Sequence, residues 1–325
     1  MRITAWSAIS PFGYGRAAFL EGLRAGRPSY QVPGFDIAEQ LGAKGTGSMD
    51  RSSALAVAAV GALLKDVATD ASTGVVLGTT SGSTATQFAF TRESLVRRKP
   101  YFVNPALMPF ALMNSAAAQC AIWHGLTGPN TTVANGRMSG LVALRYAGRL
   151  LAGGRASGLV CGAVEEHGEE RALLERHLSG AENQLGEGCA VLFLEPAGPG
   201  GGLADVVAVD TRLVVDESPH RTLAGCLRQV LRDAEVTPGA VSAVAVSSSG
   251  DVERAAVEEV LGGMPTMVDP ALLTGDTGAA TGVFQMAALL GLAGDGAGWA
   301  VATCADRDGM VGCALLRLLG KDVAG

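Results

Sequence analysis

Cysteine and histidine are the residue types in this sequence best suited to nucleophilic catalysis and to metal binding. The 325 residues include six cysteines and four histidines. The cysteines lie far apart in apolar surroundings without a C-x-x-C pair, and the histidines have no metal-ligand spacing. We therefore expect core cysteines and surface or capping histidines, with no metal site, no cofactor and no disulfide framework. The residues are Cys120, Cys161, Cys189, Cys226, Cys304, Cys313, His124, His167, His177 and His220.

The common catalytic motifs are also missing. The sequence has no P-loop G-x-x-x-x-G-K, no G-x-S-x-G elbow, no H-E-x-x-H and no G-x-G-x-x-G at a strand-to-helix turn. Phosphate-loop, hydrolase, zinc-protease and dinucleotide chemistry are therefore not indicated.

Short apolar runs rich in β-branched residues alternate with helical patterns along the chain. The expected strands are 74–78, 158–162, 190–195, 241–246, 299–304 and 312–316, and the expected helices are 51–65, 115–123, 139–151, 223–234, 253–261 and 281–292. This alternation predicts a layered α/β fold. The Gly/Pro-rich segment 196–202 divides the chain into residues 1–195 and 196–325. Each part ends in an apolar strand pair, which predicts two related halves of one compact unit.

Charged residues are scarce and slightly more acidic than basic. The chain has 25 basic and 31 acidic side chains, a net charge of −6, and is 48% hydrophobic. Without a Lys/Arg block, neither nucleic acid nor an anionic membrane is an expected partner. Residues 101–136 carry no charge, but their prolines and asparagines argue against a membrane-spanning helix. The amino terminus lacks a signal-peptide pattern, which favours a cytoplasmic protein.

Several short segments, in order, resemble the β-ketoacyl synthase family of thiolase-fold condensing enzymes. WSAISPFG (6–13) resembles the family's G-x-x-S-P-x-G start, MDR (49–51) its helix entry, VVLGTTSG (75–82) its V-V-x-G-T strand, GLTGPNTTV (125–133) its G-L-x-G-P-x-x-T-V, and GEGCAVLFLE (186–195) its GEGAAVLVLE. The resemblance implies a thiolase-like fold of two related α/β halves in layered αβαβα packing.

At the positions that match the family's catalytic residues, this sequence carries other residue types. The family's nucleophilic cysteine, in T-A-C-A-S-G, lies on a turn at a helix amino terminus, where amides favour a thiolate and an oxyanion. Arg137 takes that position here, and an always-protonated guanidinium cannot attack a thioester. The family's two histidines align with Ser247, or a neighbour of it in 248–249, and with Asp276. Its lysine aligns with Ala271, and its gating loop G-F-G-G with Asp306–Gly309.

These replacements suggest how the old catalytic pocket is filled. We expect Arg137 to make a bidentate, charge-assisted bond to Asp276, Asp306 or Asp308 and so to block the pocket. The alternative is that Arg137 points to solvent. Ser139, near the start of the following helix, is expected to cap rather than to react.

The uncharged stretch acquires a role from the same resemblance. In the family, the segment before G-L-x-G-P packs at a subunit interface, and in chain length factors its side chains bound the tunnel that receives the growing chain. This implies a tunnel and interface role for Phe102, Met108, Phe110, Leu112 and Met113. Ordinary core packing is the alternative for each of them.

The resemblance therefore implies a catalytically inactive ketosynthase-like subunit, a chain length factor. Such a subunit pairs with an active ketosynthase as a heterodimer and helps to set acyl or polyketide chain length on an acyl carrier protein. Two alternatives remain open. One is a free-standing enzyme with Asp276 as base or Arg137 as an anion clamp, and the other is a homodimeric acyl-binding scaffold.

Overall fold

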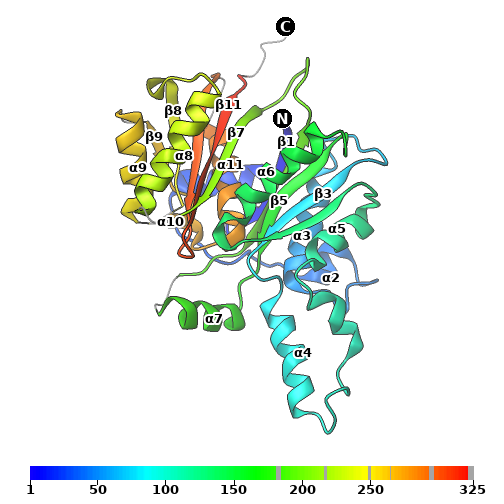
Figure 1. The fold of residues 1–325 in the computed structure, drawn as a ribbon. Coiled ribbons are helices and arrows are strands. Elements are labelled where there is room, and N and C mark those ends of the chain that lie inside the picture. Colours follow the sequence, from blue (N-terminus) through cyan, green and yellow to red (C-terminus); the bar gives the residue numbers. More distant parts are fainter. Residues whose placement is uncertain (181–183, 216–217, 248–249, 264, 293–295, 321–325) are drawn as a thin grey trace.

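A mixed β-sheet organises the chain, which the computed structural model describes over residues 1–180, 184–215, 218–247, 250–263, 265–292 and 296–320 (Figure 1). The strands are β1 (Arg2–Ser10), β2 (Gly13–Tyr14), β3 (Gly74–Thr79), β4 (Asn130–Ala134), β5 (Leu159–Glu165), β6 (Gly188–Glu195), β7 (Ala204–Leu213), β8 (Val241–Ala245), β9 (Thr266–Val268), β10 (Gly298–Ala305) and β11 (Met310–Leu318). The α-helices are α1 (Gly15–Ala25), α2 (Ile37–Leu41), α3 (Arg51–Leu63), α4 (Thr84–Val96), α5 (Ser115–His124), α6 (Ser139–Ala152), α7 (Glu169–Ser179), α8 (Pro219–Asp233), α9 (Asp251–Leu261), α10 (Ala271–Thr274) and α11 (Thr281–Leu292). Short 3-10 turns are η1 (Pro105–Phe110), η2 (Gly136–Met138), η3 (Pro238–Ala240) and η4 (Gly278–Ala280).

The strand order divides the sheet into two equivalent halves. The order is β4-β3-β5-β6-β1-β7-β11-β10-β8-β9. The short strand β2 pairs with β1 outside this order and is left out of the count. If the remaining strands are numbered along the chain within each half, both halves run third, second, fourth, fifth, first from the outer edge of the sheet to its centre. They meet where β1 pairs with β7 through Arg2 opposite Asp205 and Ile3 opposite Ala204. The expectation of two related α/β halves is confirmed.

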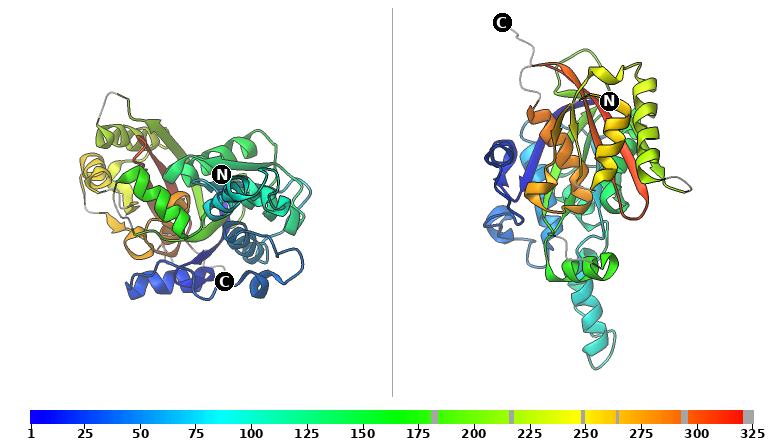
Figure 2. Two further views of the ribbon diagram at one scale, coloured as in Figure 1. Left: turned by 90° about the horizontal axis from the view of Figure 1, so that it is seen from below. Right: turned by 90° about the vertical axis from the view of Figure 1, so that its left-hand side faces the viewer.

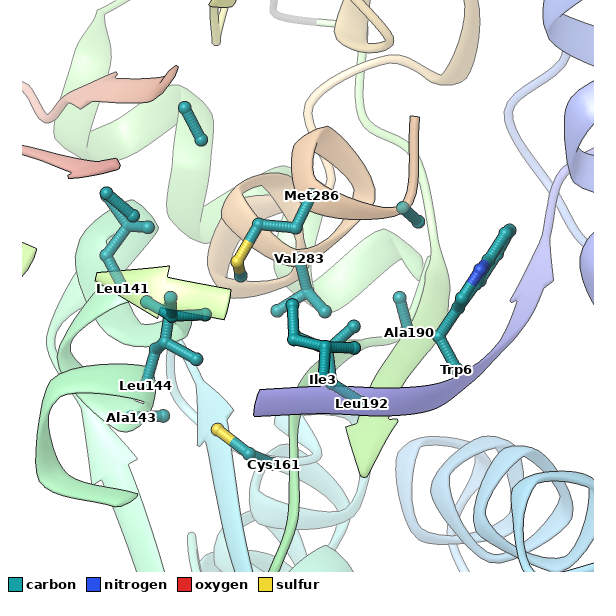
Figure 3. Close-up of a cluster of buried hydrophobic side chains, with 14 of the residues drawn as sticks. Ile3, Trp6, Leu141, Ala143, Leu144, Cys161, Ala190, Leu192, Val283 and Met286 are labelled. Atoms are coloured by element: carbon teal, nitrogen blue, oxygen red, sulfur yellow. The ribbon is translucent and has the colours of Figure 1, made fainter. Parts of the chain in front are cut away.

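Three layers of helices alternate with the two halves of the sheet. One apolar cluster joins α3 and α5 to the first half, and another joins α8 and α9 to the second half. The central cluster joins α6 and α11, which lie between the halves. Figure 3 shows Leu141 and Leu144 of α6 close to Val283 and Met286 of α11, with Ile3 of β1 beside them. This is the αβαβα packing expected from the sequence.

The strands and helices expected from the sequence are all present, with ends shifted by a few residues. Several further elements were not expected, above all β1, β7, α4 and α7. Strand β1 contributes Ile3 and Ala8 to the central cluster and Ala5 and Ile9 to the α3 cluster. Since each face of β1 is buried but small and polar residues interrupt it, its sequence shows neither a clean alternation nor a continuous apolar run.

The uncharged stretch 101–136 forms no single helix. It runs through η1, α5 and β4, which are separated by turns. Among the described residues, no helix is long and apolar enough to cross a membrane.

A projection that we call the arm, residues 84–114, extends away from the sheet and contains α4 and η1 (Figures 1 and 2). Its large apolar side chains are mostly exposed: Phe88, Leu95, Val96, Tyr101, Phe102, Met108, Leu112 and Met113. The two ends of the arm meet the body where α4 and α5 begin. An exposed apolar projection of this kind is typical of a protein-binding surface.

Candidate functional site

Four loops bring the residues of the predicted site together. Arg137 lies on η2, between β4 and α6, and Ser247 follows β8. Asp276 lies between α10 and η4, and Asp306 lies in the turn between β10 and β11. The residues are distant in sequence, yet all of them contact Arg137. Ser248 and Ser249, the other serines aligned with the family's first histidine, lie outside the described residues.

Arg137 points into the protein and is held by a carboxylate. Its Nη2 lies 2.6 Å from Oδ2 of Asp276, and its Nη1 donates to the carbonyl of Ser247 at 3.2 Å. Burial acts to lower the pKa of Arg137, but the charge and hydrogen bond of Asp276, together with further nearby groups such as Asp306, outweigh it and the pKa is raised. Burial likewise acts to raise the pKa of Asp276, and Arg137 together with Arg171 brings it below its usual value. Both groups are charged at neutral pH, and the expected ion pair with Asp276 is present. Of the expected bidentate bond, the described contact is the one from Nη2 to Oδ2.

A second carboxylate, that of Asp306, accepts a hydrogen bond from the backbone amide of Arg137. The N–H of Arg137 donates to Oδ2 of Asp306 at 2.6 Å. This amide lies on the turn before α6, where an unpaired N–H favours an anion. Gly136 makes the approach possible, because it has a φ of +53° and a Cβ there would collide with Asp306. The chain thus supplies its own anion to this turn.

Asp276 is fixed by contacts around its backbone. Its Oδ1 accepts a hydrogen bond from the N–H of Gly278 at 2.9 Å. Arg171 of α7 donates to the carbonyls of Asp276 at 2.9 Å and of Gly186 at 2.7 Å. Arg171 also lies 3.6 Å from the buried carboxylate of Glu165. The loop therefore holds Asp276 in place for its pairing with Arg137.

Ser247 is bound to a buried glutamate that the sequence analysis missed. The Ser247 hydroxyl donates to Oε1 of Glu253, and its N–H donates to Oε2 at 2.6 Å. Thr303 Oγ1 and the N–H of Ala305 also donate to this carboxylate, at 3.1 Å and 2.9 Å. Burial raises the pKa of Glu253. The only signal in the sequence was an acidic residue beside the apolar positions of α9, which is also what a solvent-facing helix would show.

A cavity of about 440 Å³ opens beside these groups. Arg137, Asp276 and Asp306 line its inner wall, and Arg171, Glu175 and Arg307 line the side nearer α7. Arg307 and Glu175 form an ion pair. The lining combines these charged side chains with uncharged ones such as Pro219, Val252 and Ala305. The ion-paired end of the cavity, around Arg137 and Asp276, is a poor receptor for an acyl chain.

The remaining nucleophile candidates have structural roles. Ser139 Oγ accepts from the N–H of Asn135 at 2.8 Å and lies 3.0 Å from the carbonyl of Thr79. The six cysteines are buried as expected. Burial raises the pKa of the thiol of Cys304, the cysteine whose Sγ lies near the Arg137 carbonyl. Within the described residues, no group of histidine, cysteine and acidic side chains is arranged to hold a metal ion.

The predicted tunnel residues lie on the arm and do not line this cavity. Phe102, Met108, Leu112 and Met113 are about half exposed. Phe110 differs from them, since it is only 7% exposed and packs in the cluster around α3. In this chain Phe110 is therefore a core residue, as the alternative interpretation allowed.

Comparisons with known proteins add independent information. Residues 29–181 match the sequence model of the "Beta-ketoacyl synthase, N-terminal domain" family. The chain is 29% identical over 142 residues to 3-oxoacyl-[acyl-carrier-protein] synthase 2 of Vibrio cholerae, covering 42% of this chain and 34% of that protein. It is 30% identical over 194 residues to the tetracenomycin polyketide synthase ketoacyl synthase alpha subunit of Streptomyces glaucescens, covering 50% and 45%. The matches thus span less than half the length of these curated relatives.

A solved structure is similar over nearly the full chain. The structure described as the ishigamide ketosynthase/chain length factor superposes with a TM-score of 0.91 at 41% sequence identity. The match covers 98% of this chain and 99% of that chain.

Proposed function

Because the chain belongs to the β-ketoacyl synthase family, in the ketosynthase and chain length factor group of type II polyketide synthases, we propose that it is a non-catalytic subunit. In this role it pairs with an active ketosynthase and helps to set the length of the acyl or polyketide chain built on an acyl carrier protein. The observation that carries the proposal is the Arg137–Asp276 ion pair, at the two positions that the sequence resemblance aligns with the family's cysteine and histidine.

The contacts of the site argue against a nucleophile, an oxyanion donor and a general base among these residues. A guanidinium cannot act as the nucleophile. An oxyanion requires a free backbone donor, whereas the Arg137 N–H already donates to Asp306. Asp276 is held ionised by Arg137, and a carboxylate with a lowered pKa is a weak base at neutral pH. The contacts of Arg137 with Asp306 and with Asp276 also disfavour the alternative of a free-standing enzyme that uses Asp276 or Arg137.

The outer edge of the sheet supports a partner subunit. Among the described residues β4 pairs only with β3, so its other edge is available to a strand from another chain. Nearby on α5, Ile122 is 73% exposed and Trp123 is partly exposed. With the apolar side chains of the arm, these residues form an apolar face of the kind that subunit interfaces bury.

The chain-length role is proposed for the same face. Phe102, Met108, Leu112 and Met113 offer adaptable apolar surface, and methionine in particular adjusts to a flexible chain. We place the growing chain against these residues, at the interface with the partner, and not in the charged cavity around Arg137.

Co-expression with an active type II ketosynthase and its carrier protein tests the proposal. We expect a one-to-one complex that makes extended products, and no condensation by this chain alone. Asp276→Ala in the purified single chain is the matched test of the enzyme alternative. Turnover by the isolated wild-type chain that Asp276→Ala abolishes would overturn the proposal. A stable homodimer that ignores the ketosynthase would instead favour the scaffold.

A further inference from the structure

Two buried carboxylates lie at the base of the arm. Glu166, directly after β5, is 3% exposed, and Asp50, which caps α3, is 6% exposed. Neither forms an ion pair with a described residue. Buried carboxylates are normally paired with a cation or held by hydrogen bonds. Asp50 accepts the N–H of Ser53 at 2.8 Å as the cap of α3, so the burial of Glu166 is the one that requires another explanation.

Each carboxylate is bound to one end of the arm. Glu166 Oε1 accepts from Ser83 Oγ at 3.0 Å and from the N–H of Ala85 at 3.3 Å, where α4 begins. Asp50 Oδ2 accepts from Ser115 Oγ at 3.5 Å, where α5 begins and the arm ends. Ser115 Oγ also lies 2.9 Å from the hydroxyl of Ser53. The arm is thus attached to the body at both ends through these two acids.

The charge of Glu166 is costly in this position. Burial raises its pKa to about 7, and the nearby negative charge of Asp50 acts in the same direction, as does Glu165 more weakly. The N–H of Ala85 and the hydroxyl of Ser83 lower the pKa of Glu166 but do not compensate for its burial.

Other charged groups pack around the same acid. Arg51 of α3 is near enough to interact with Glu166, but it is bonded to Glu187 at 2.6 Å. Arg171 of α7 donates to the Glu166 carbonyl and not to its carboxylate. Burial lowers the pKa of the adjacent His167 below its ordinary value of 6.5. This histidine is therefore neutral at any pH above 6.5.

We propose that Glu166 is a protonation-dependent anchor of the arm, and therefore of the face that binds the partner subunit. The protonated acid holds α4 against the body. The ionised acid, beside Asp50, favours release of the arm, because the carboxylate then reaches water. The consequence for partner binding rests on the proposed function, whereas the anchoring of the arm does not.

The direction with pH follows from proton linkage. In the attached state the pKa is about 7, and in a released state it returns toward 4.5. A group with a raised pKa stabilises the attached state fully below pH 4.5, and this contribution is lost as the pH rises to about 7. Between pH 6 and pH 8 we therefore expect about tenfold more opening of the arm.

Hydrogen exchange of the whole chain tests the anchor without the partner. Exchange in peptides from residues 84–114 is compared at pH 6 and pH 8 after correction for intrinsic rates. We expect about tenfold more opening at pH 8 in the wild type, and less than about twofold change in Glu166→Gln, which is neutral at both pH values. The control Glu169→Gln, an exposed acid on α7, should retain the wild-type response.

Two outcomes would overturn the anchor. One is a wild-type arm whose corrected exchange does not change between pH 5.5 and pH 8.5, a result that needs no variant to fold. The other is an equal pH response in the wild type and in Glu166→Gln.

Affinity for the active ketosynthase, measured at the same two pH values, separates this inference from the proposed function. Weaker binding at pH 8 in the wild type but not in Glu166→Gln supports both. Binding that does not respond to pH in either protein, while the arm opens, overturns the link to the partner. Absence of binding at both pH values counts against the proposed function, and the exchange result then decides the anchor by itself.

Discussion

Arg137 is a buried cation, and two carboxylates lie against it. Asp276 pairs with its guanidinium, and Asp306 accepts its backbone N–H. A buried arginine without such partners would lose several kcal/mol of hydration. The replacements at positions 137 and 276 therefore depend on one another, as a pair of opposite charges requires.

Replacing Asp276 alone should lower the free energy of unfolding more than replacing both Arg137 and Asp276. Asp276→Asn leaves the Arg137 charge under-compensated, and we expect a loss of about 3 kcal/mol in the free energy of unfolding. The double variant Arg137→Met/Asp276→Asn should lose less than that, which gives a coupling energy of about 2 kcal/mol. Urea denaturation of the wild type, both single variants and the double variant measures the cycle.

An exposed ion pair provides the matched control. Arg16 and Asp66 lie 2.6 Å apart with both side chains nearly half exposed. Asp66→Asn should change the free energy of unfolding by less than about 0.5 kcal/mol. Equal effects of Asp276→Asn and Asp66→Asn would mean that Arg137 does not depend on its carboxylate.

At the scale of elements, the turn η2 decides what the start of α6 can bind. The residue before Arg137 is a glycine with positive φ, and the Asp306 carboxylate lies against it. The backbone conformation of one turn and the closing loop of the β10–β11 hairpin therefore act together. A side chain at position 136 would disturb both.

Gly136→Ala should therefore be strongly destabilising. The new Cβ adds left-handed backbone strain and a collision with Asp306, and we expect a loss of about 3 kcal/mol or more. Gly154 is the control, because it has a similar φ of +63° and open space around its Cβ position. Gly154→Ala should cost about 1 kcal/mol. Thermal and urea unfolding of both variants checks the difference, and similar losses would show that Asp306 yields without cost.

The arm is the element to which we assign chain length. Leu112→Trp or Met113→Trp should shift the products of the assembled synthase toward shorter chains, because a larger side chain fills space at the interface. Product masses from the reconstituted complex are the measurement. Leu173→Trp, at a similarly exposed leucine of α7, should leave the product length unchanged. Unchanged products in Leu112→Trp and Met113→Trp, with an intact complex, would remove the tunnel role.

At the scale of the whole molecule, the strands at the centre of the sheet join the two halves into one unit, although a Gly/Pro-rich segment separates the halves in sequence. Strand β1 is hydrogen-bonded to β6 and to β7, so it belongs to the sheet of both halves. Asp205 of β7 binds Arg2 of β1 and Arg317 of β11 at the same junction, at 2.9 Å and 2.5 Å. The central apolar cluster also includes residues from both halves.

The two halves should unfold together. Trp6 and Trp123 lie in the first half and Trp299 in the second. Variants in which Trp123 and one other tryptophan are replaced, so that only Trp6 or only Trp299 remains, report on each half separately. Fluorescence and far-ultraviolet circular dichroism should give one urea midpoint in both variants. Two separated midpoints within one variant would indicate halves that fold independently.

Much of the fold could be predicted from local sequence. Continuous apolar runs such as 190–195 and amphipathic patterns such as 139–151 report the layers in which they are buried, because periodicity records which faces avoid water. The sequence of α4 shows no such pattern, because most of the surface of this helix is exposed in the single chain. The sequence of β1 shows no clear pattern either, because both of its faces are buried and small or polar residues separate Ile3, Trp6 and Ile9.

The sequence by itself determined that position 137 carries a guanidinium, which cannot act as a nucleophile, and only its resemblance to the family aligns positions 137 and 276 with a cysteine and a histidine. Only the tertiary structure decided what those residues do instead. It chose Asp276 as the ionic partner among three candidate acids, gave Asp306 to a backbone amide, and placed Glu253 and Glu166 in the interior. The physical reason is that pairing and desolvation depend on distances of a few ångströms between residues more than 100 positions apart, which no local pattern records.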